Sequence, residues 1–225
     1  MPVKLIIFDL DGTLVYSIED ISNALNHALA RVGLPGMSIE ETLKCVGGGV
    51  DNLVKTALVN IAHKNISESD SLTDLKETVL DSFLEYYSGH ITDFTRPCEG
   101  VVEALEALSG YKKAVVSNKP ESLSRKLLRE LNMDGYFEMI SGGDSFVEMK
   151  PSPVPIIMTM EKLKAAAGET VMVGDSKADV NSGRMAGVRT IAAAYGYRPA
   201  NTLGGADFLI EKALTEIIPI IRKIV

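Results

Sequence analysis

The first predicted element is a short strand at residues 3–8. Val3 and the run from Leu5 to Phe8 form an almost uninterrupted apolar stretch that is rich in branched side chains. A short run of this kind is typical of a strand that is buried on both faces of a parallel sheet.

The hydrophobic period changes after this strand. Apolar residues recur at intervals of three and four from Ile18 to Val32, which predicts a helix, and the sequence GLPG at residues 33–36 ends it. Ser38 precedes Glu41 by three residues, which is the pattern of a capping box at the start of a second, shorter helix.

Two longer helices are predicted after the glycines at residues 47–49. They cover residues 50–63 and 72–87, and the second carries its apolar residues on one stripe. Residues 17–91 therefore predict four successive helices without a strand, which indicates an all-helical insertion.

Helices and strands alternate in the rest of the chain. The pattern predicts helices near residues 99–109, 120–131, 153–166 and 177–186, a terminal helix, and strands near residues 112–117, 137–141, 170–174, 188–194 and 207–210. Such alternation predicts an α/β fold, a doubly wound parallel sheet with a Rossmann-like core. The expected domains are a core of residues 1–16 and 92–225 and an inserted four-helix domain of residues 17–91.

Composition narrows the possible partners. A hydrophobic fraction of 46% in 225 residues is enough for a core, and the net charge of −7 argues against a nucleic-acid partner, which needs clustered lysine and arginine. No apolar run reaches the roughly 18 residues that span a bilayer. Cys45 and Cys98 show neither a disulfide pattern nor zinc-ligand spacing. We expect a cytoplasmic protein without a membrane partner, and the sequence does not determine an oligomeric state.

Candidate chemistry begins where the first strand ends. Asp9 and Asp11 follow it at the edge where open α/β sheets bind ligands, and side chains two residues apart in an extended chain point the same way. Gly12 allows a sharp turn, and the Thr13 hydroxyl can hydrogen-bond an oxyanion or orient a carboxylate. An ordinary acidic turn is the alternative interpretation.

Later strand ends add complementary groups. Ser117 and Asn118 can donate hydrogen bonds to phosphate-like oxygens, although a plain strand-to-helix cap has the same pattern. Lys150 could offset the acids with its charge or could be a solvated surface lysine. Asp175 ends the strand at residues 170–174, and Asp179 lies one helical turn further on the same side.

Four carboxylates are thus expected in one crevice, from Asp9, Asp11, Asp175 and Asp179. Like charges at such a spacing repel one another, so the cluster requires a cation. Ligation by oxygen atoms alone favours Mg²⁺.

Together these motifs resemble the haloacid dehalogenase-like phosphatase superfamily along the entire chain. The sequences DLDGT, SN, KP and GDSKAD occur in the superfamily's order, at residues 9–13, 117–118, 150–151 and 174–179. The helical insertion resembles the small helical cap of the superfamily, and the most similar members are phosphoglycolate phosphatases. Tyr16 departs from the pattern, because many relatives carry an acid there, at the entry to the cap.

The resemblance implies a role for each motif. Asp9 would be the nucleophile and Asp11 the general acid and base. Asp175 would bind Mg²⁺ together with Asp9 and the backbone carbonyl of Asp11, with Asp179 and Ser176 in support. The groups that position the phosphate or the nucleophile would be Thr13, Ser117 and Lys150.

The glycines at residues 47–49 have two interpretations. The backbone amides of Gly48 and Gly49, at the start of the third helix of the cap, could bind the carboxylate of a substrate. They could equally form a simple connector between two helices.

These features predict a Mg²⁺-dependent phosphatase that acts on a small phosphorylated metabolite, best 2-phosphoglycolate, through an aspartyl-phosphate intermediate. Inorganic pyrophosphatase and sugar-phosphate mutase activities use the same residues and stay open as alternatives. A receiver-like phospho-acceptor module would not need the helical insertion, and a dehalogenase would need neither Asp11 nor a metal site.

Overall fold

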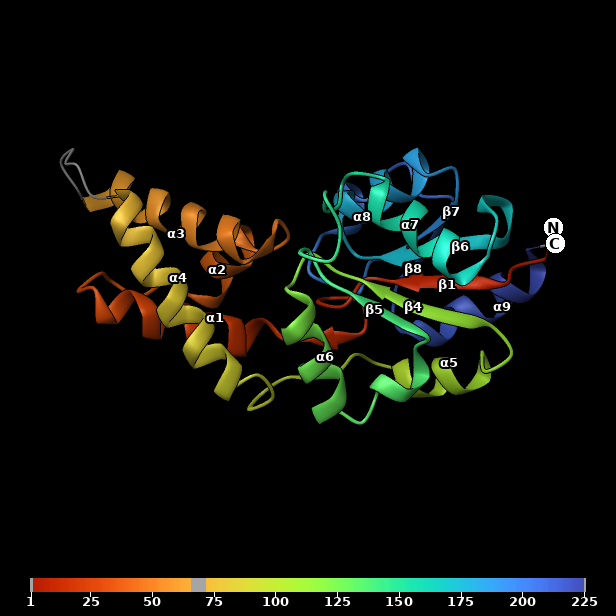
Figure 1. The fold of residues 1–225 in the computed structure, drawn as a ribbon, viewed down its shortest axis with the longest axis horizontal. Coiled ribbons are helices and arrows are strands. Elements are labelled where there is room, and N and C mark those ends of the chain that lie inside the picture. The colour runs from red at the N-terminus through yellow and green to blue at the C-terminus, as the bar shows by residue number, and fades with distance from the viewer. Residues whose placement is uncertain (1, 66–71, 225) are drawn as a thin grey trace. The chain divides into compact units, whose positions relative to one another are not determined.

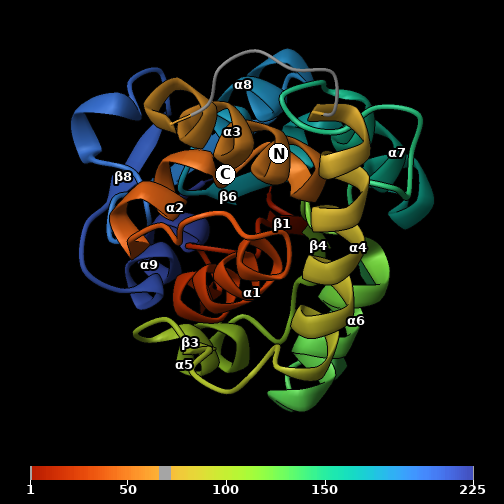
Figure 2. The same cartoon turned by 90° about the vertical axis from the view of Figure 1, so that its left-hand side faces the viewer.

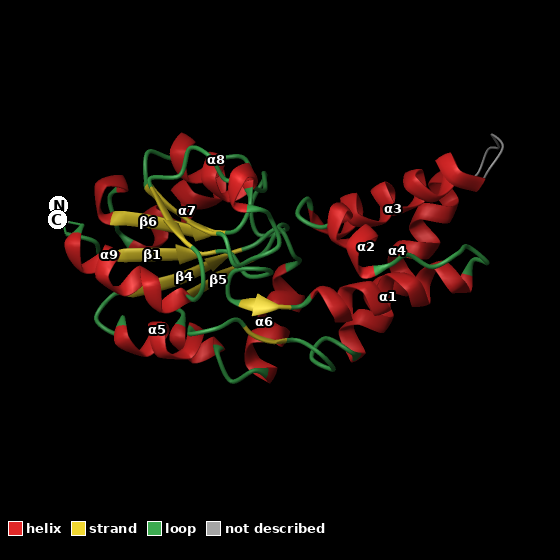
Figure 3. Ribbon diagram, turned by 180° about the vertical axis from the view of Figure 1, so that it is seen from behind, coloured by secondary structure: helices red, strands yellow, loops and turns green. Residues whose placement is uncertain are grey.

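The computed structural model describes residues 2–65 and 72–224. Within these residues, six parallel strands form one sheet in the order β5-β4-β1-β6-β7-β8 (Figure 1), and their arrows point the same way in Figure 3. The bounds are β1 Leu5–Phe8, β4 Lys112–Val116, β5 Met139–Ser141, β6 Thr170–Gly174, β7 Arg189–Ala193 and β8 Phe208–Ile210.

Helices cover both faces of this sheet. Helices α5 and α6 lie on one face and α7 and α8 on the other (Figures 1 and 3), and α9 packs against α5. The predicted doubly wound α/β fold is confirmed. The bounds are α5 Val101–Ala107, α6 Glu121–Glu130, α7 Val154–Leu163, α8 Lys177–Met185 and α9 Ile217–Lys223.

The first strand is the centre of the core. All four residues of β1 are fully buried, because β4 and β6 flank it and helices cover it from both faces. Leu5 and Ile7 pack with Ile156 and Met160 of α7. Each such side chain contributes about 1.5–3 kcal/mol by leaving water, so the apolar run that opens the chain stabilises the middle of the sheet.

Contacts between residues divide the chain into two compact units, Met1–Tyr16 with Arg96–Val225, and Ser17–Thr95. The second unit contains α1 Ile18–Arg31, α2 Ile39–Cys45, α3 Gly49–Asn65 and α4 Leu72–Gly89. In it α1 packs against α4, and α3 packs against α2 and α4 (Figure 2).

The predicted capping box of α2 is confirmed. The Ser38 side chain accepts a hydrogen bond from the amide of Glu41 at 3.2 Å, and the Ser38 amide donates to Oε2 of Glu41 at 2.9 Å. Two amides that the helix itself leaves without acceptors are therefore satisfied at its first turn.

A short antiparallel ribbon was not predicted from the sequence. It pairs β2, Val15–Tyr16, with β3, Arg96–Pro97, and it belongs to the unit that contains the sheet. Two-residue strands are too short to show a periodic pattern.

The second unit extends to residue 95, four residues beyond the expected junction at 91/92. The reason is the buried carboxylate of Asp20 in α1. It accepts hydrogen bonds from the amide of Phe94 at 3.1 Å, and from the amide and hydroxyl of Thr95 at 2.8 and 2.6 Å. Residues 92–95 are thus tied to α1.

None of the helices described combines the length and the apolar character that a crossing of the bilayer requires.

Replacing Asp20 with alanine should lower the free energy of unfolding by about 2–4 kcal/mol, because the amides of Phe94 and Thr95 lose a charged acceptor. Urea unfolding followed by circular dichroism measures this loss. Asp81→Ala, at an exposed position of α4, is the matched control and should change stability by no more than about 0.5 kcal/mol. Equal midpoints for the two variants would contradict the role given to Asp20.

Candidate active site

The predicted acids meet at the carboxyl ends of two neighbouring strands. Asp9 follows β1 and Asp175 follows β6, which is adjacent to β1 in the sheet. Carboxylate oxygens of Asp9, Asp175 and Asp179 lie within 4.8 Å of one another. Three of the four acids therefore share one small space, which we call the acid cluster, and the carboxylate of Asp11 has a different partner.

The turn after β1 is built around Gly12. Its φ of +85° lies in the left-handed region, and a Cβ on this residue would lie 2.3 Å from Oδ2 of Asp175. The amides of Leu14 and Val15 donate to the carbonyl of Leu10 at 2.9 and 3.1 Å and close the turn. The turn therefore requires glycine and lies directly against the acid cluster.

Asp179 is held by the first turn of α8. Its Oδ2 accepts hydrogen bonds from the amide and the hydroxyl of Ser176, which is the N-cap residue, at 3.0 and 2.5 Å. A carboxylate at this position also interacts favourably with the positive end of the helix dipole. Ser176 thereby orients Asp179 toward the acid cluster.

Lys150 is the buried cation of the acid cluster. Its Nζ lies 2.8 Å from Oδ1 of Asp9 and 2.7 Å from Oδ1 of Asp179, and its side chain is only 2% exposed. Asn118 holds the backbone of this lysine: its amide nitrogen donates to the Lys150 carbonyl at 2.8 Å, and its amide oxygen accepts from the Lys150 amide at 3.0 Å. Lys150 is therefore not a solvated surface lysine, and the Asn118 amide is engaged in positioning it.

The pKa values of the groups in the acid cluster are shifted by burial and by neighbouring charges. Burial, with the charge of Asp179, raises the pKa of Asp9 to about 6 although Lys150 acts in the opposite direction. Burial and the charges of Asp9 and Asp179 raise the pKa of Asp175 well above its usual range. Burial lowers the pKa of Lys150, but the two neighbouring acids outweigh this effect and raise it. One ammonium group thus does not balance three carboxylates.

The donor set fits a hard divalent cation. The acid cluster offers carboxylate oxygens from both strand ends, and carboxylate oxygens are the ligands that Mg²⁺ prefers in proteins. A bound cation would also offset the repulsion that raises the pKa of Asp9 and Asp175. The residues present could therefore hold such an ion.

Sequence reasoning missed the partner of Asp11. Nζ of Lys119 donates to both carboxylate oxygens of Asp11, at 2.6 and 2.8 Å, and the Lys119 side chain is 4% exposed. Lys119 comes two residues after Ser117, at the end of the strand beside β1. A lysine directly after a strand end with other polar groups is the signal that could have identified it.

Two buried hydroxyls follow the carboxyl ends of the neighbouring strands β1 and β4. Thr13 is fully buried, and its Oγ1 has no hydrogen-bond partner among the residues that the structure describes. Ser117 is 4% exposed, and its Oγ accepts from the Lys119 amide at 3.3 Å. A buried hydroxyl without a partner is costly, so Thr13 in particular is suited to a ligand.

A further segment was absent from the sequence prediction. The amide of Tyr197, after β7, donates to Oδ2 of Asp175 at 2.6 Å. A backbone amide of this kind cannot be recognised from residue type.

Gly48 and Gly49 belong to the helical unit Ser17–Thr95. Gly49 is the first residue of α3 and has a φ of +81°. The suggested contact of these glycines with a substrate stays a prediction.

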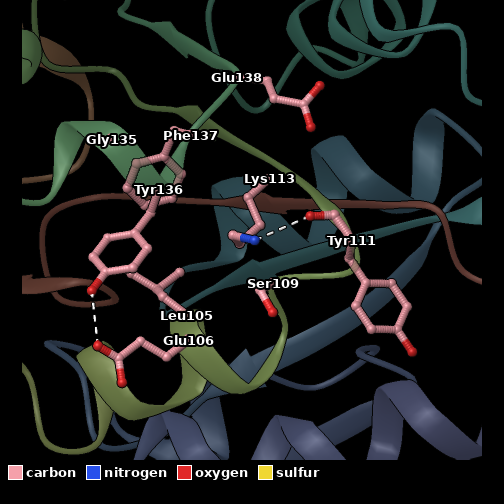
Figure 4. Close-up of a pocket in the computed structure, with 9 residues that line it drawn as sticks. All are labelled: Leu105, Glu106, Ser109, Tyr111, Lys113, Gly135, Tyr136, Phe137 and Glu138. Atoms are coloured by element: carbon pink, nitrogen blue, oxygen red, sulfur yellow. Dashed lines mark hydrogen bonds between the residues drawn. The ribbon is translucent and has the colours of Figure 1, made fainter.

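A hollow of about 440 Å³ is lined by residues that include Lys113, Tyr136 and Glu138 (Figure 4). It lies at the start of β4, whereas the acids lie at the carboxyl ends of the strands. Lys113, on its wall, pairs in register with Ile6 near the start of β1, and its Nζ donates to the carbonyls of Leu108 and Tyr111 at 2.9 and 3.1 Å. The hollow is therefore separate from the acid cluster.

The chain is similar to known proteins along most of its length. The family model of haloacid dehalogenase-like hydrolases matches residues 6–193. A phosphoglycolate phosphatase of Aquifex aeolicus is 38% identical over 202 residues, which are 89% of each chain. One of Vibrio parahaemolyticus is 35% identical over 225 residues, 97% of this chain and 96% of its own.

A solved structure is also similar to this chain. The crystal structure of a predicted phosphoglycolate phosphatase from Haemophilus somnus matches this fold with a TM-score of 0.91 and 32% identity, over 97% of each chain.

In metal-free buffer, Lys150→Met should lower the free energy of unfolding by about 3–5 kcal/mol, because Asp9 and Asp179 lose a buried counter-charge. The loss should be smaller at about pH 5 than at about pH 8, since acid protonates carboxylates whose pKa burial has raised. Urea unfolding at both pH values tests this expectation.

The control is Lys126→Met, which removes a half-exposed lysine 3.6 Å from Glu130. It should cost at most about 1 kcal/mol at either pH. A loss in Lys150→Met no larger than in this control would contradict the charge-balancing role of Lys150.

Proposed function

The chain belongs to the haloacid dehalogenase-like hydrolase family, and we propose that it is a Mg²⁺-dependent phosphatase that hydrolyses 2-phosphoglycolate through an aspartyl-phosphate on Asp9. The observation that carries this proposal is the acid cluster with Lys150 buried against it. The choice of substrate is supported by the phosphoglycolate phosphatases to which the chain is similar.

The acid cluster would hold the metal. Asp9 and Asp175 would bind Mg²⁺ with the backbone carbonyl of Asp11, while Asp179 would support them from its position beside Lys150. When bound, Mg²⁺ would supply neutralisation of the negative charge on the phosphoryl oxygens.

Asp9 acts as the nucleophile. A carboxylate oxygen of Asp9 forms a bond to phosphorus while the bond from phosphorus to the ester oxygen breaks. Lys150, 2.8 Å from Oδ1 of Asp9, orients this carboxylate and lowers the repulsion between it and the phosphate dianion. The buried hydroxyls of Thr13 and Ser117 donate to the phosphoryl oxygens.

Asp11 carries the proton in both steps. Its carboxyl group gives a proton to the leaving alkoxide, and its carboxylate then takes a proton from the water that attacks phosphorus and releases Asp9. Lys119, bound to both oxygens of Asp11, fixes the direction of this carboxylate. The amides of Gly48 and Gly49 are our candidates for binding the carboxylate of 2-phosphoglycolate.

A substrate comparison tests the proposal. With Mg²⁺, kcat/KM for 2-phosphoglycolate should exceed that for pyrophosphate and for glucose 1-phosphate by about tenfold or more, as measured by release of free phosphate. Excess EDTA, or Asp175→Asn, should lower it by about 10³ or more, because the carboxylates then repel the substrate.

Two results would contradict the proposed function. A higher kcat/KM for pyrophosphate would make the protein a pyrophosphatase, and full turnover in EDTA would exclude the metal assignment.

The roles of Asp9 and Asp11 can be separated with p-nitrophenyl phosphate, whose leaving group needs little protonation. Asp11→Asn should still be phosphorylated but should hydrolyse its aspartyl-phosphate about 10² to 10⁴ times more slowly than the wild type. Asp9→Asn should never be phosphorylated. Mass spectrometry after rapid quenching, with peptide mapping, should find one phosphoryl group on Asp9 in Asp11→Asn. A phosphoryl group elsewhere, or on Asp9→Asn, would refute the two assignments.

A further inference from the structure

Three consecutive residues that the mechanism does not use lie against the acid cluster. Tyr195, Gly196 and Tyr197 follow the carboxyl end of β7, the strand next to β6. All three are half-buried. We refer to them as the YGY segment.

The YGY segment is packed tightly against Asp175. The Tyr197 amide donates to Oδ2 of Asp175 at 2.6 Å. A Cβ on Gly196 would lie 2.4 Å from Cβ of Asp175 and 2.4 Å from the carbonyl oxygen of Gly12. Both contacts are shorter than real Cβ atoms show, so only glycine allows the segment to approach Asp175 and the turn after β1 at once.

The same segment also holds that turn. The Tyr195 hydroxyl donates to the backbone carbonyl of Thr13 at 2.8 Å. Burial raises the pKa of Tyr195, so this hydroxyl stays protonated and able to donate. The bond fixes the backbone of Thr13, whose own side chain is buried without a partner among the described residues.

The third residue of the segment contacts the β2–β3 ribbon. The Tyr197 ring meets the Tyr16 ring edge to face, with centroids 5.6 Å apart, and the Arg96 guanidinium lies 5.3 Å from the centroid of the Tyr16 ring. Tyr16 and Arg96 are paired in the ribbon, and they are the residues at which the chain leaves and re-enters the unit that contains the sheet.

We propose that the YGY segment is a positioning element of the active site. The Tyr197 amide orients Asp175 for the metal, the Tyr195 hydroxyl fixes the turn that carries Asp11 and Thr13, and the Tyr197 ring links both to the β2–β3 ribbon. The kinetic part of this inference rests on the proposed function, whereas its metal-binding part does not.

The first test removes the hydroxyl and keeps the ring. Tyr195→Phe should lower kcat about 5- to 20-fold, while KM stays within about twofold, because the turn that carries Asp11 and Thr13 loses a contact. Tyr136→Phe, which loses an exposed hydroxyl bonded to Glu106 at 3.2 Å, is the control and should keep kcat within about twofold. An unchanged kcat in Tyr195→Phe, or an equal loss in the control, would overturn the role of Tyr195.

The second test measures Mg²⁺ binding alone, by isothermal titration calorimetry without substrate. Gly196→Ala should raise the Kd about tenfold or more, because the new Cβ displaces Asp175. Tyr197→Ala should raise it about three- to tenfold and Tyr197→Phe should restore it, because phenylalanine keeps the ring. Circular dichroism of each variant in EDTA verifies that it is folded, and Tyr197→Ala keeps the test decisive where Gly196→Ala does not fold.

The link to the ribbon is tested by a double variant. If the Tyr197 ring acts through Tyr16, then Tyr16→Ala combined with Tyr197→Ala should raise the Kd no more than Tyr197→Ala alone, within about twofold. Additive effects would overturn the link, and a Kd in Tyr197→Ala equal to that of the wild type would overturn the positioning of Asp175. Failure of 2-phosphoglycolate as a substrate would leave these Kd values unaffected, so the two proposals fail separately.

Discussion

Charge balance at the carboxyl ends of β1 and β6 is the constraint on which the rest of the structure depends. Three carboxylates within 4.8 Å of one another, of which Asp175 and Asp179 are buried, cannot all be ionised at low cost. Lys150 supplies one positive charge against three carboxylates, and burial together with the neighbouring acids raises the pKa of Asp9 and Asp175. Such residual negative charge is suited to a hard cation, and in the proposed function Mg²⁺ occupies this place.

The sheet makes this crowding possible. The buried apolar strand β1 lies between β4 and β6, and the carboxyl ends of all three strands lie at the same edge of the sheet. Each of the three strands is followed there by polar residues. The helical unit is inserted directly after the turn of β1, through the β2–β3 ribbon. The buried strand β1 and Asp9 of the acid cluster are therefore consecutive in sequence, and burial of the strand holds this carboxylate in position.

The sequence predicted the fold well because the fold follows from repeated patterns. Each of these patterns depends on residues that are close together in the chain. They are the period of the helices, the apolar strands and the Ser38–Glu41 capping box. The features that the sequence did not predict leave no pattern among neighbouring residues. Val15–Tyr16 and Arg96–Pro97 are too short for a pattern, Lys119 meets Asp11 across 108 positions, and Tyr197 acts through its backbone amide. Residue type predicts which groups can do chemistry, but not which of them become partners.

The two acids of the DLDGT motif illustrate that limit. Asp9 and Asp11 are two residues apart and follow one strand, yet each has its own lysine: Lys150 binds Asp9 and Asp179, whereas Lys119 binds both oxygens of Asp11. These partners give two identical side chains different surroundings: Asp9 lies among other carboxylates, and both oxygens of Asp11 accept from the Lys119 ammonium group. Two carboxyl groups in different surroundings can perform different tasks. In the proposed mechanism this separation allows Asp9 to attack phosphorus while Asp11 transfers the proton.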